Sequence, residues 1–187
     1  MSMKRKTFFT LIIMAFVLSF FVTPVGYWGK IWLMRVFASP PDIIKVEDRQ
    51  QIDGYDWKLK DANWDLFNFN KSKGKVLFVH FWASWNTPSA AELKGIQELY
   101  DRYSNQVDFY LITNEEREPV EEFMAKNKYT FPVTYRIVGE DAPVKIPKIQ
   151  GTYIIDKNGA IAVYAEEPHD WDNNTVTQLL DSLSNTP

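Results

Sequence analysis

The segment VHFWASWNTPSAAELK, residues 79–94, gathers the side chains that could do chemistry. An apolar stretch ends in an aromatic turn, and Asn86 and Ser89 follow with Pro88 between them, at the start of a helical pattern. An amide is not a nucleophile, and the Ser89 hydroxyl becomes one only if a neighbouring base takes its proton. His80, on the preceding strand, is the candidate base. The segment therefore offers serine chemistry or no covalent chemistry of its own.

The same residues also have a structural interpretation. Asn86 and Ser89 are of the types that cap helices, and Pro88 suits the first turn of a helix. The sequence shows no carboxylate that would orient His80 and no oxyanion-hole pattern. We therefore expect Asn86 and Ser89 to cap a helix and His80 to be a packed, hydrogen-bonded residue of a sheet. Under this interpretation the chain is not an enzyme and has no catalytic residue.

The flanking elements would position this segment within a sheet. The apolar run at residues 74–82 predicts a strand buried on both faces, and apolar residues at intervals of three and four predict an amphipathic helix over 89–103. Similar patterns predict strands over 57–59, 63–69 and 107–113, helices over 118–127 and 173–183, and a hairpin over 151–165 whose Asn158-Gly159 turn supplies positive φ. This order predicts an α/β fold, a three-layer sandwich with a central mixed sheet and helices on both faces.

Composition restricts the chemistry further. The 187 residues include no cysteine, which excludes disulfides, thiolate metal sites and thiol reactions of the chain itself. The two histidines, His80 and His169, lie far apart in the sequence, so we expect no metal and no other cofactor. From residue 39 onward the chain contains 16 Lys and Arg and 24 Asp and Glu. This net negative charge is unsuited to binding nucleic acid.

The N-terminal segment differs from the rest of the chain. Residues 7–28 carry no charge, follow a basic triplet at residues 4–6, and end in Tyr27 and Trp28, as in a transmembrane helix with an aromatic belt. A cleaved signal peptide ending at Ala38 is the alternative. We expect residues 1–41 to be a cytoplasmic stub, a single transmembrane helix and a juxtamembrane segment, and residues 42–187 to be an extracytoplasmic domain.

Four segments together resemble a known family. They are KGKVLFVHFWASWNTPSAAELKGIQELYDRY at 73–103, FPV at 131–133, TYIIDKNGAI at 152–161 and DW at 170–171. This combination is similar to the membrane-anchored thiol-disulfide oxidoreductases of the TlpA/ResA type. The resemblance implies a thioredoxin-like fold on the periplasmic side of a bacterial inner membrane.

The sequence departs from that family where the family does its chemistry. Asn86 and Ser89 stand at the positions of the attacking and resolving cysteines, with Thr87 and Pro88 between them, and Gln150 stands where the resemblance implies a cis-proline. Because a non-proline cis bond costs about 2.5–4 kcal/mol, we expect a trans bond at Gln150 and a reshaped groove. His80 occupies the position at which thioredoxins keep a buried acid.

Two classes of function follow. The preferred hypothesis is a redox-inactive protein that binds other proteins, either as an accessory subunit of a membrane complex or as a holder of exported proteins. The binding residues would be those at the rim of the degenerate site: Trp82, Trp85, Pro88, Gln150 and Gly151. The alternative is an oxidoreductase family member whose chemistry comes from a partner, or whose cysteines were replaced by design.

Overall fold

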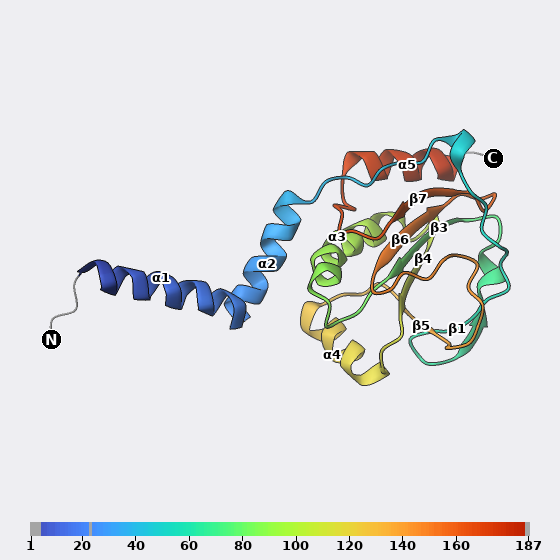
Figure 1. The fold of residues 1–187 in the computed structure, drawn as a ribbon. Helices are drawn as coiled ribbons and strands as arrows, with labels where there is room; N and C mark the ends of the chain where they lie inside the picture. Colours follow the sequence, from blue (N-terminus) through green and yellow to red (C-terminus); the bar gives the residue numbers. More distant parts are fainter. Residues whose placement is uncertain (1–4, 23, 186–187) are drawn as a thin grey trace.

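The computed structural model describes residues 5–22 and 24–185, and its centre is a seven-stranded mixed sheet (Figure 1). The strand order is β2-β1-β5-β4-β3-β6-β7, in which β3, β4 and β5 are parallel and the other neighbours are antiparallel. The strands are β1 (Lys58–Lys60), β2 (Leu66–Asn68), β3 (Val76–Phe81), β4 (Val107–Thr113), β5 (Val133–Arg136), β6 (Gly151–Ile155) and β7 (Ile161–Ala165). The predicted mixed sheet is confirmed.

Three helices of the domain pack on one face of this sheet, which corrects the prediction of helices on both faces. They are α3 (Thr87–Tyr103), α4 (Arg117–Asn127) and α5 (Asn174–Asn185), and their apolar residues share one core with alternate residues of β3 and β4. The opposite face is covered by non-helical segments and by the short 3₁₀ helix η2 (Phe69–Ser72); a second 3₁₀ helix, η1 (Val46–Asp48), precedes the sheet. Two right-handed crossovers that step in the same direction, β3 to β4 and β4 to β5, place α3 and α4 on the same face.

Strand β3 lies in the interior of the sheet, between β4 and β6. All six of its residues are buried, as its continuous apolar run predicts, because cores lie against both of its faces. Phe78 packs on the helical side with Trp171, and Leu77 and Val79 pack on the other side with Trp57. The segment that contains Asn86 and Ser89 therefore follows a strand that is buried along its whole length.

Several local expectations needed correction. Strand β5 was not predicted, and the strand expected over 63–69 shortens to β2 because Trp64 adopts a positive φ of 68° in the preceding turn. The hairpin is confirmed, although only Gly159 of its turn has positive φ, at 85°. The cap of α5 is also confirmed, since the Asn173 Oδ1 accepts a hydrogen bond of 3.0 Å from the Val176 amide.

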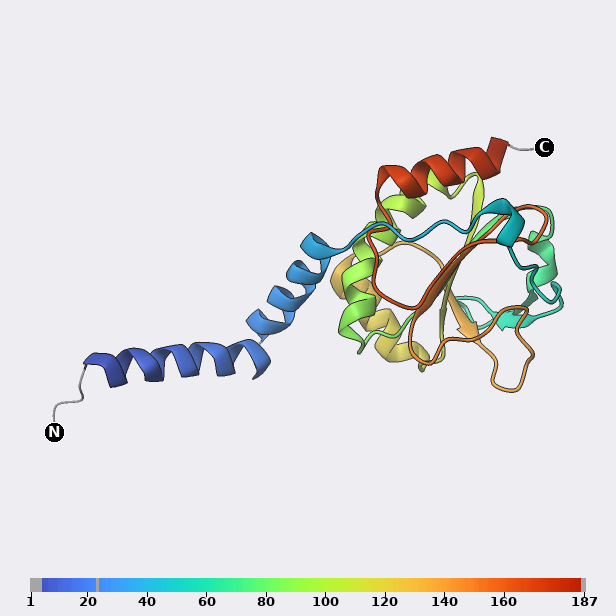
Figure 2. The same cartoon turned by 45° about the horizontal axis from the view of Figure 1, so that its top comes forward.

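The N-terminal segment forms two helices where one was expected over residues 7–28. They are α1 (Arg5–Val22) and α2 (Pro24–Phe37), and residue 23 lies outside the described residues. Figures 1 and 2 show α1 extending away from the domain and α2 lying beside α3. Within the described part of the chain, neither helix combines the length and the apolar character needed to cross a bilayer.

Candidate functional site

Asn86 caps the helix that begins at the degenerate site. Its Oδ1 accepts hydrogen bonds of 2.9 Å from both the backbone amide and the hydroxyl of Ser89. Helix α3 starts at Thr87, with Pro88 in its first turn, where a missing N–H is harmless. The capping role predicted for Asn86 is confirmed, while Ser89 is a partner of the cap rather than the cap itself.

Gln150 closes the site from the other side. The Ser89 hydroxyl lies 3.1 Å from the Gln150 Oε1, and its one hydrogen can serve this oxygen or the Asn86 Oδ1. Ser89 is fully buried, so its hydroxyl does not face solvent. No cis peptide bond occurs among the described residues, which confirms the trans bond expected at Gln150. Asn86, Ser89 and Gln150, at which the resemblance implies two cysteines and a proline, thus lie within hydrogen-bond distance of one another.

Glu92 extends this polar network into the core. Its Oε2 accepts a hydrogen bond of 3.2 Å from the Gln150 amide, and its Oε1 accepts 2.6 Å and 3.1 Å bonds from the Trp171 indole and the His169 backbone. Burial raises the pKa of Glu92 to about 7, although the bonds from Trp171 and His169 oppose that rise. Sequence reasoning did not assign Glu92; its spacing of three from Ser89 on one helix face was the available signal.

His80 does not activate Ser89. It is fully buried, its Nδ1 lies 2.8 Å from the Thr152 Oγ1, and none of the hydrogen bonds among the described residues joins it to Ser89. Its Nε2 has no hydrogen-bond partner in the described part of the chain. Burial lowers the pKa of His80 to about 3, so the ring is neutral near pH 7. This is the packed sheet histidine that the sequence predicts, and the serine mechanism lacks its base.

A second carboxylate, which sequence reasoning missed, fixes the turn before α3. The Glu115 carboxylate accepts 2.6 Å hydrogen bonds from the backbone amide and the hydroxyl of Ser84. The Thr113 hydroxyl, at the end of β4, donates to the same carboxylate at 3.2 Å. The turn is therefore tied to the neighbouring strand by groups other than Asn86 and Ser89.

The two tryptophans of the expected aromatic rim separate in the structure. Trp82 is 2% exposed and packs its ring against Phe123 and Phe131, so it belongs to the core and not to a surface platform. Only its edge reaches a small hollow of about 80 Å³ beside Ile149. Trp85 is 67% exposed and remains available at the surface.

A shallow hollow brings together three of the predicted site residues. Its volume is about 290 Å³, and its lining consists of Asn86, Pro88, Lys148, Ile149, Gln150, Glu166, Glu167 and Pro168. Gly151 lies below the loop that forms one wall, where a Cβ atom would come within 3.0 Å of Pro147, so its role is to admit the loop. Thr87 opens α3 and is not among the lining residues.

The polar groups at the centre of this site contact one another. The site offers amide, hydroxyl and carboxylate groups that are already paired, together with apolar surface at Ile149. Among the described residues, no group of three histidine or acidic side chains is placed to hold a metal ion. Without a thiolate the site cannot attack a disulfide.

Comparison with known proteins agrees with this geometry. Residues 53–164 match the AhpC/TSA family. The chain is 27% identical to the thioredoxin-like protein YneN of Bacillus subtilis, an alignment that covers 73% of this chain and 80% of that protein. It is 30% identical to sporulation thiol-disulfide oxidoreductase A of the same species, over 70% of this chain and 82% of that one.

Solved structures show the same fold at lower identity. A DsbF homologue from Corynebacterium diphtheriae superposes with a TM-score of 0.62 at 15% identity, covering 78% of this chain and 94% of that one. A thiol:disulfide interchange protein DsbE from Chlorobium tepidum gives 0.61 at 16% identity, covering 73% and 99%. The chain therefore belongs to the AhpC/TSA family of thioredoxin-like proteins, related to the thiol-disulfide oxidoreductases and without their cysteines.

Proposed function

We propose that this protein is a redox-inactive thioredoxin-like domain that binds other proteins at the degenerate site. The observation that carries the proposal is the hydrogen bonding of Asn86, Ser89 and Gln150 to one another, in a fold that is otherwise intact. The chain supplies no redox-active thiol, yet the hollow beside these residues stays open at the surface.

The surface around the hollow has the character of a small protein-binding site. Trp85 and Ile149 expose apolar area, and Lys148, Glu166 and Glu167 place charges around it. Protein interfaces combine an aromatic or apolar centre with a polar rim. Trp82 is buried in the core, so the contact with a partner rests on Trp85 and Ile149.

We also propose that the N-terminal segment holds the domain to a bacterial inner membrane, with the domain on the periplasmic side. The support is the uncharged run at 7–28, the basic triplet before it, and the exposed apolar side chains of α1, among them Phe9, Ile13 and Phe16. The partner would then be a membrane protein or an exported protein. An accessory subunit and a holder of exported proteins both fit this placement.

Site-specific photo-crosslinking in cells that contain this protein tests the binding proposal. A photoreactive phenylalanine analogue would replace Trp85 in one variant and Ile149 in another, with exposed Leu66 on β2 as the matched control. We expect one defined set of crosslinked proteins at 85 and 149 and none of them at 66. Equal products at all three positions, or reduction of insulin disulfides by the purified chain, would contradict the proposal.

A further inference from the structure

Helix α2 has two faces of different character. Side chains at intervals of three and four, Tyr27, Ile31 and Met34, pack toward α3 and the nearby Phe123. The opposite face is apolar and exposed, and it consists of Trp28, Trp32, Leu33, Val36 and Phe37. A water-facing helix surface is normally polar. Trp32 is 62% exposed and Phe37 is 80% exposed, so this face lacks a covering partner within the described chain.

The face of α2 that contains Ile31 and Arg35 is bound to the domain, and this contact sets the direction in which the opposite, outer face points. Ile31 is 2% exposed against Ala90 and Ala91 of α3. The Arg35 guanidinium donates hydrogen bonds of 2.9 Å and 3.2 Å to the backbone carbonyls of Ala91 and Ala90. Helix α2 therefore cannot turn its apolar outer face toward the domain without losing these contacts.

The segment that follows α2 is also hydrogen-bonded to the domain, through Ser39. The Ser39 carbonyl accepts a hydrogen bond of 3.0 Å from the Asp170 amide, and the His169 Nδ1 lies 3.1 Å from the same oxygen. Asp170 follows the residue whose backbone binds Glu92, so the connection reaches the polar network of the site. The helix and the domain are thus held together at both the middle and the end of α2.

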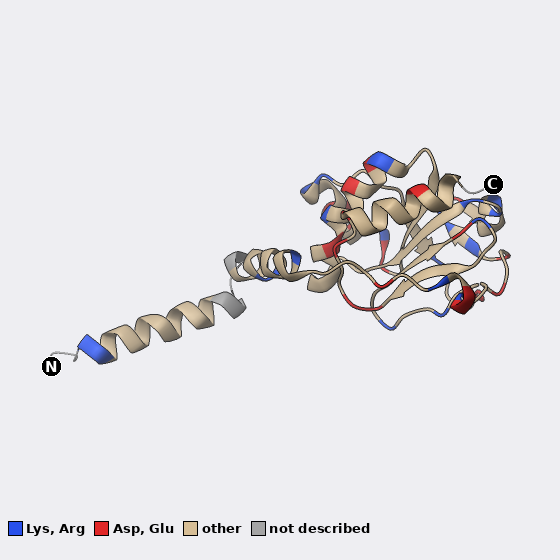
Figure 3. Ribbon diagram, turned by 90° about the horizontal axis from the view of Figure 1, so that it is seen from above, with Lys and Arg blue, Asp and Glu red and all other residues tan. Residues whose placement is uncertain are grey.

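The chain that precedes α2 indicates what covers its outer face. Helix α1 also exposes apolar side chains, among them Phe9, Ile13 and Phe16, so the exposed apolar surface continues from α1 to α2. In Figure 3 the described part of α1 carries charge at its start and is otherwise uncharged. Aromatic residues with neighbouring cations are typical of the headgroup region of a membrane that contains anionic lipids.

We propose that α2 lies in the headgroup layer of the membrane, with its Trp32 and Phe37 face toward the acyl chains and its Ile31 and Arg35 face on the domain. This inference rests on the proposed membrane attachment and adds the orientation of the domain. Lipid is already the proposed environment of α1, and the apolar outer face of α2 continues the exposed apolar surface of α1.

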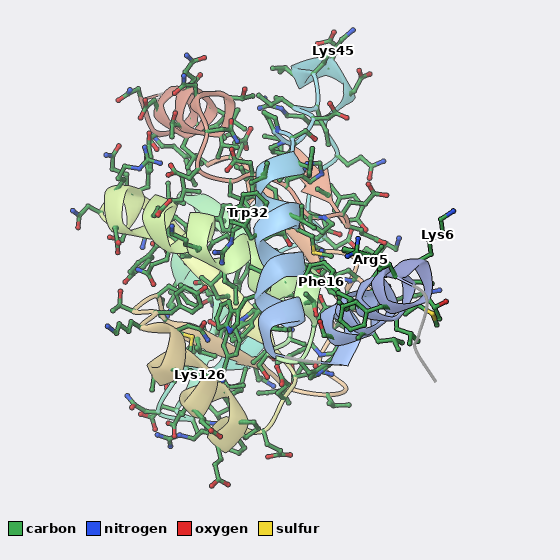
Figure 4. All side chains as sticks on the ribbon, turned by 90° about the vertical axis from the view of Figure 1, so that its left-hand side faces the viewer. Arg5, Lys6, Phe16, Trp32, Lys45 and Lys126 are labelled. Carbon is green, nitrogen blue, oxygen red and sulfur yellow. The ribbon has the colours of Figure 1, made fainter. Side chains whose placement is uncertain are left out.

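The placement fixes how the domain sits on the membrane. In Figure 4, Trp32 lies on α2 in front of the domain, and α1 runs off from the other end of α2 toward Arg5 and Lys6. With α2 in the headgroup layer, α3 lies directly above it, so the first turn of α3 stays close to the membrane surface. A partner that reaches the hollow would approach along the membrane.

Spin labelling tests this inference, and the absence of native cysteine makes every introduced label unique. The full-length chain would be reconstituted into vesicles of phosphatidylcholine and phosphatidylglycerol, with single variants Trp32→Cys, Phe37→Cys, Ile12→Cys in α1 and Lys126→Cys in α4. Collisions of each nitroxide with oxygen, which concentrates in lipid, are compared with collisions with a water-soluble nickel chelate. We expect the labels at 32 and 37 to lie between the lipid-buried label at 12 and the water-exposed label at 126.

The outcomes separate the two proposals. If the label at 12 is in lipid and the labels at 32 and 37 match the label at 126, membrane attachment stands and the placement of α2 is overturned. Shielding of positions 32 and 37 from both reagents would mean that protein covers the face, which also overturns it. A water-exposed label at 12 would instead contradict the proposed attachment itself.

Discussion

The hydroxyl of Ser89 lies 3.1 Å from the amide oxygen of Gln150, at two positions where the resemblance implies other groups. The contact joins the first turn of α3 to the loop before β6 and is fully buried on the Ser89 side. The contact therefore couples the start of α3 to the loop before β6 through one hydrogen bond.

Replacement of Ser89 by alanine tests this coupling. The variant removes the one hydroxyl hydrogen that serves the Gln150 oxygen or the Asn86 Oδ1, so we expect the free energy of unfolding to fall by about 1 kcal/mol in urea titrations. Crosslinking at position 85 should persist, because the hydroxyl is not at the surface. Exposed Ser104→Ala, at the other end of α3, is the control and should change stability by less than about 0.5 kcal/mol. Equal effects of the two substitutions would refute the coupling.

Asn86 can be examined by a pair of substitutions. Asn86→Ala removes the acceptor for the Ser89 amide and should cost about 1 kcal/mol of stability, whereas Asn86→Asp keeps an acceptor at the start of α3 and should cost less. Thermal and urea unfolding of both variants would measure the difference. If the aspartate variant is as unstable as the alanine variant, capping is not the role of this residue.

Glu92 should give the protein an unusual dependence of stability on pH. Its pKa is raised from 4.5 to about 7, so between these pH values the folded state binds more protons than the unfolded state. The contribution of Glu92 to stability is therefore full below about pH 4.5 and declines as pH rises toward 7, by at most about 1.4 kcal/mol per pH unit. In urea unfolding from pH 4.5 to 8, the stability of Glu92→Gln relative to wild type should rise with pH up to about 7, because the variant lacks the declining contribution of Glu92. An unchanged slope would place the titration elsewhere.

His80 should act in the opposite direction. Its pKa is lowered from 6.5 to about 3, so between these values the unfolded state binds the extra proton, and stability falls as pH falls. From pH 4.5 to 6.5 the contributions of His80 and Glu92 oppose each other. We expect His80→Gln to make the protein gain stability on acidification from pH 6.5 to 4.5, measured against wild type by the same urea method. A His80 ring that becomes charged near pH 6.5 in NMR titrations would contradict this account.

The scaffold should still activate a thiol where the relatives carry one. The Ser89 backbone amide points at the side chain of Asn86, so in Asn86→Cys it would face a thiolate at a helix N-terminus. We expect the pKa of that cysteine to fall below the usual value of about 8.5, seen as alkylation by iodoacetamide at lower pH than for Ser104→Cys. Identical pH profiles for the two cysteines would show that the turn no longer supports a thiolate.

The sequence predicts well what depends on local pattern. The continuous apolar run marked β3, and the Asn-x-Pro-Ser segment at the start of an amphipathic stretch marked the cap of α3. Strand β5 is short and was missed, and without it the two same-direction crossovers that put α3 and α4 on one face could not be inferred. Trp82 and Trp85 are of one residue type, three positions apart, and only the tertiary packing decides that the first is buried.

The sequence predicted which positions form the site, but it did not predict which residues hydrogen-bond to one another there. The residues at 86, 89 and 150 were identified from the resemblance, but the pairing of Ser89 with Gln150 depends on how a distant loop meets α3. Glu92 and Glu115 were unassigned because an acidic residue on a helix or in a loop is usually solvated, and nothing local distinguishes a buried one. Such contacts are set by long-range geometry.

The attachment of Ser84 to Glu115 has a consequence for how such a chain can change over generations. The bend before residue 86 is held by a carboxylate on another loop, and this attachment uses no side chain of residues 86 and 89. A substitution at position 86 or 89 would therefore leave the attachment in place. The chemistry at these two positions could change over generations while the bend that presents them is kept.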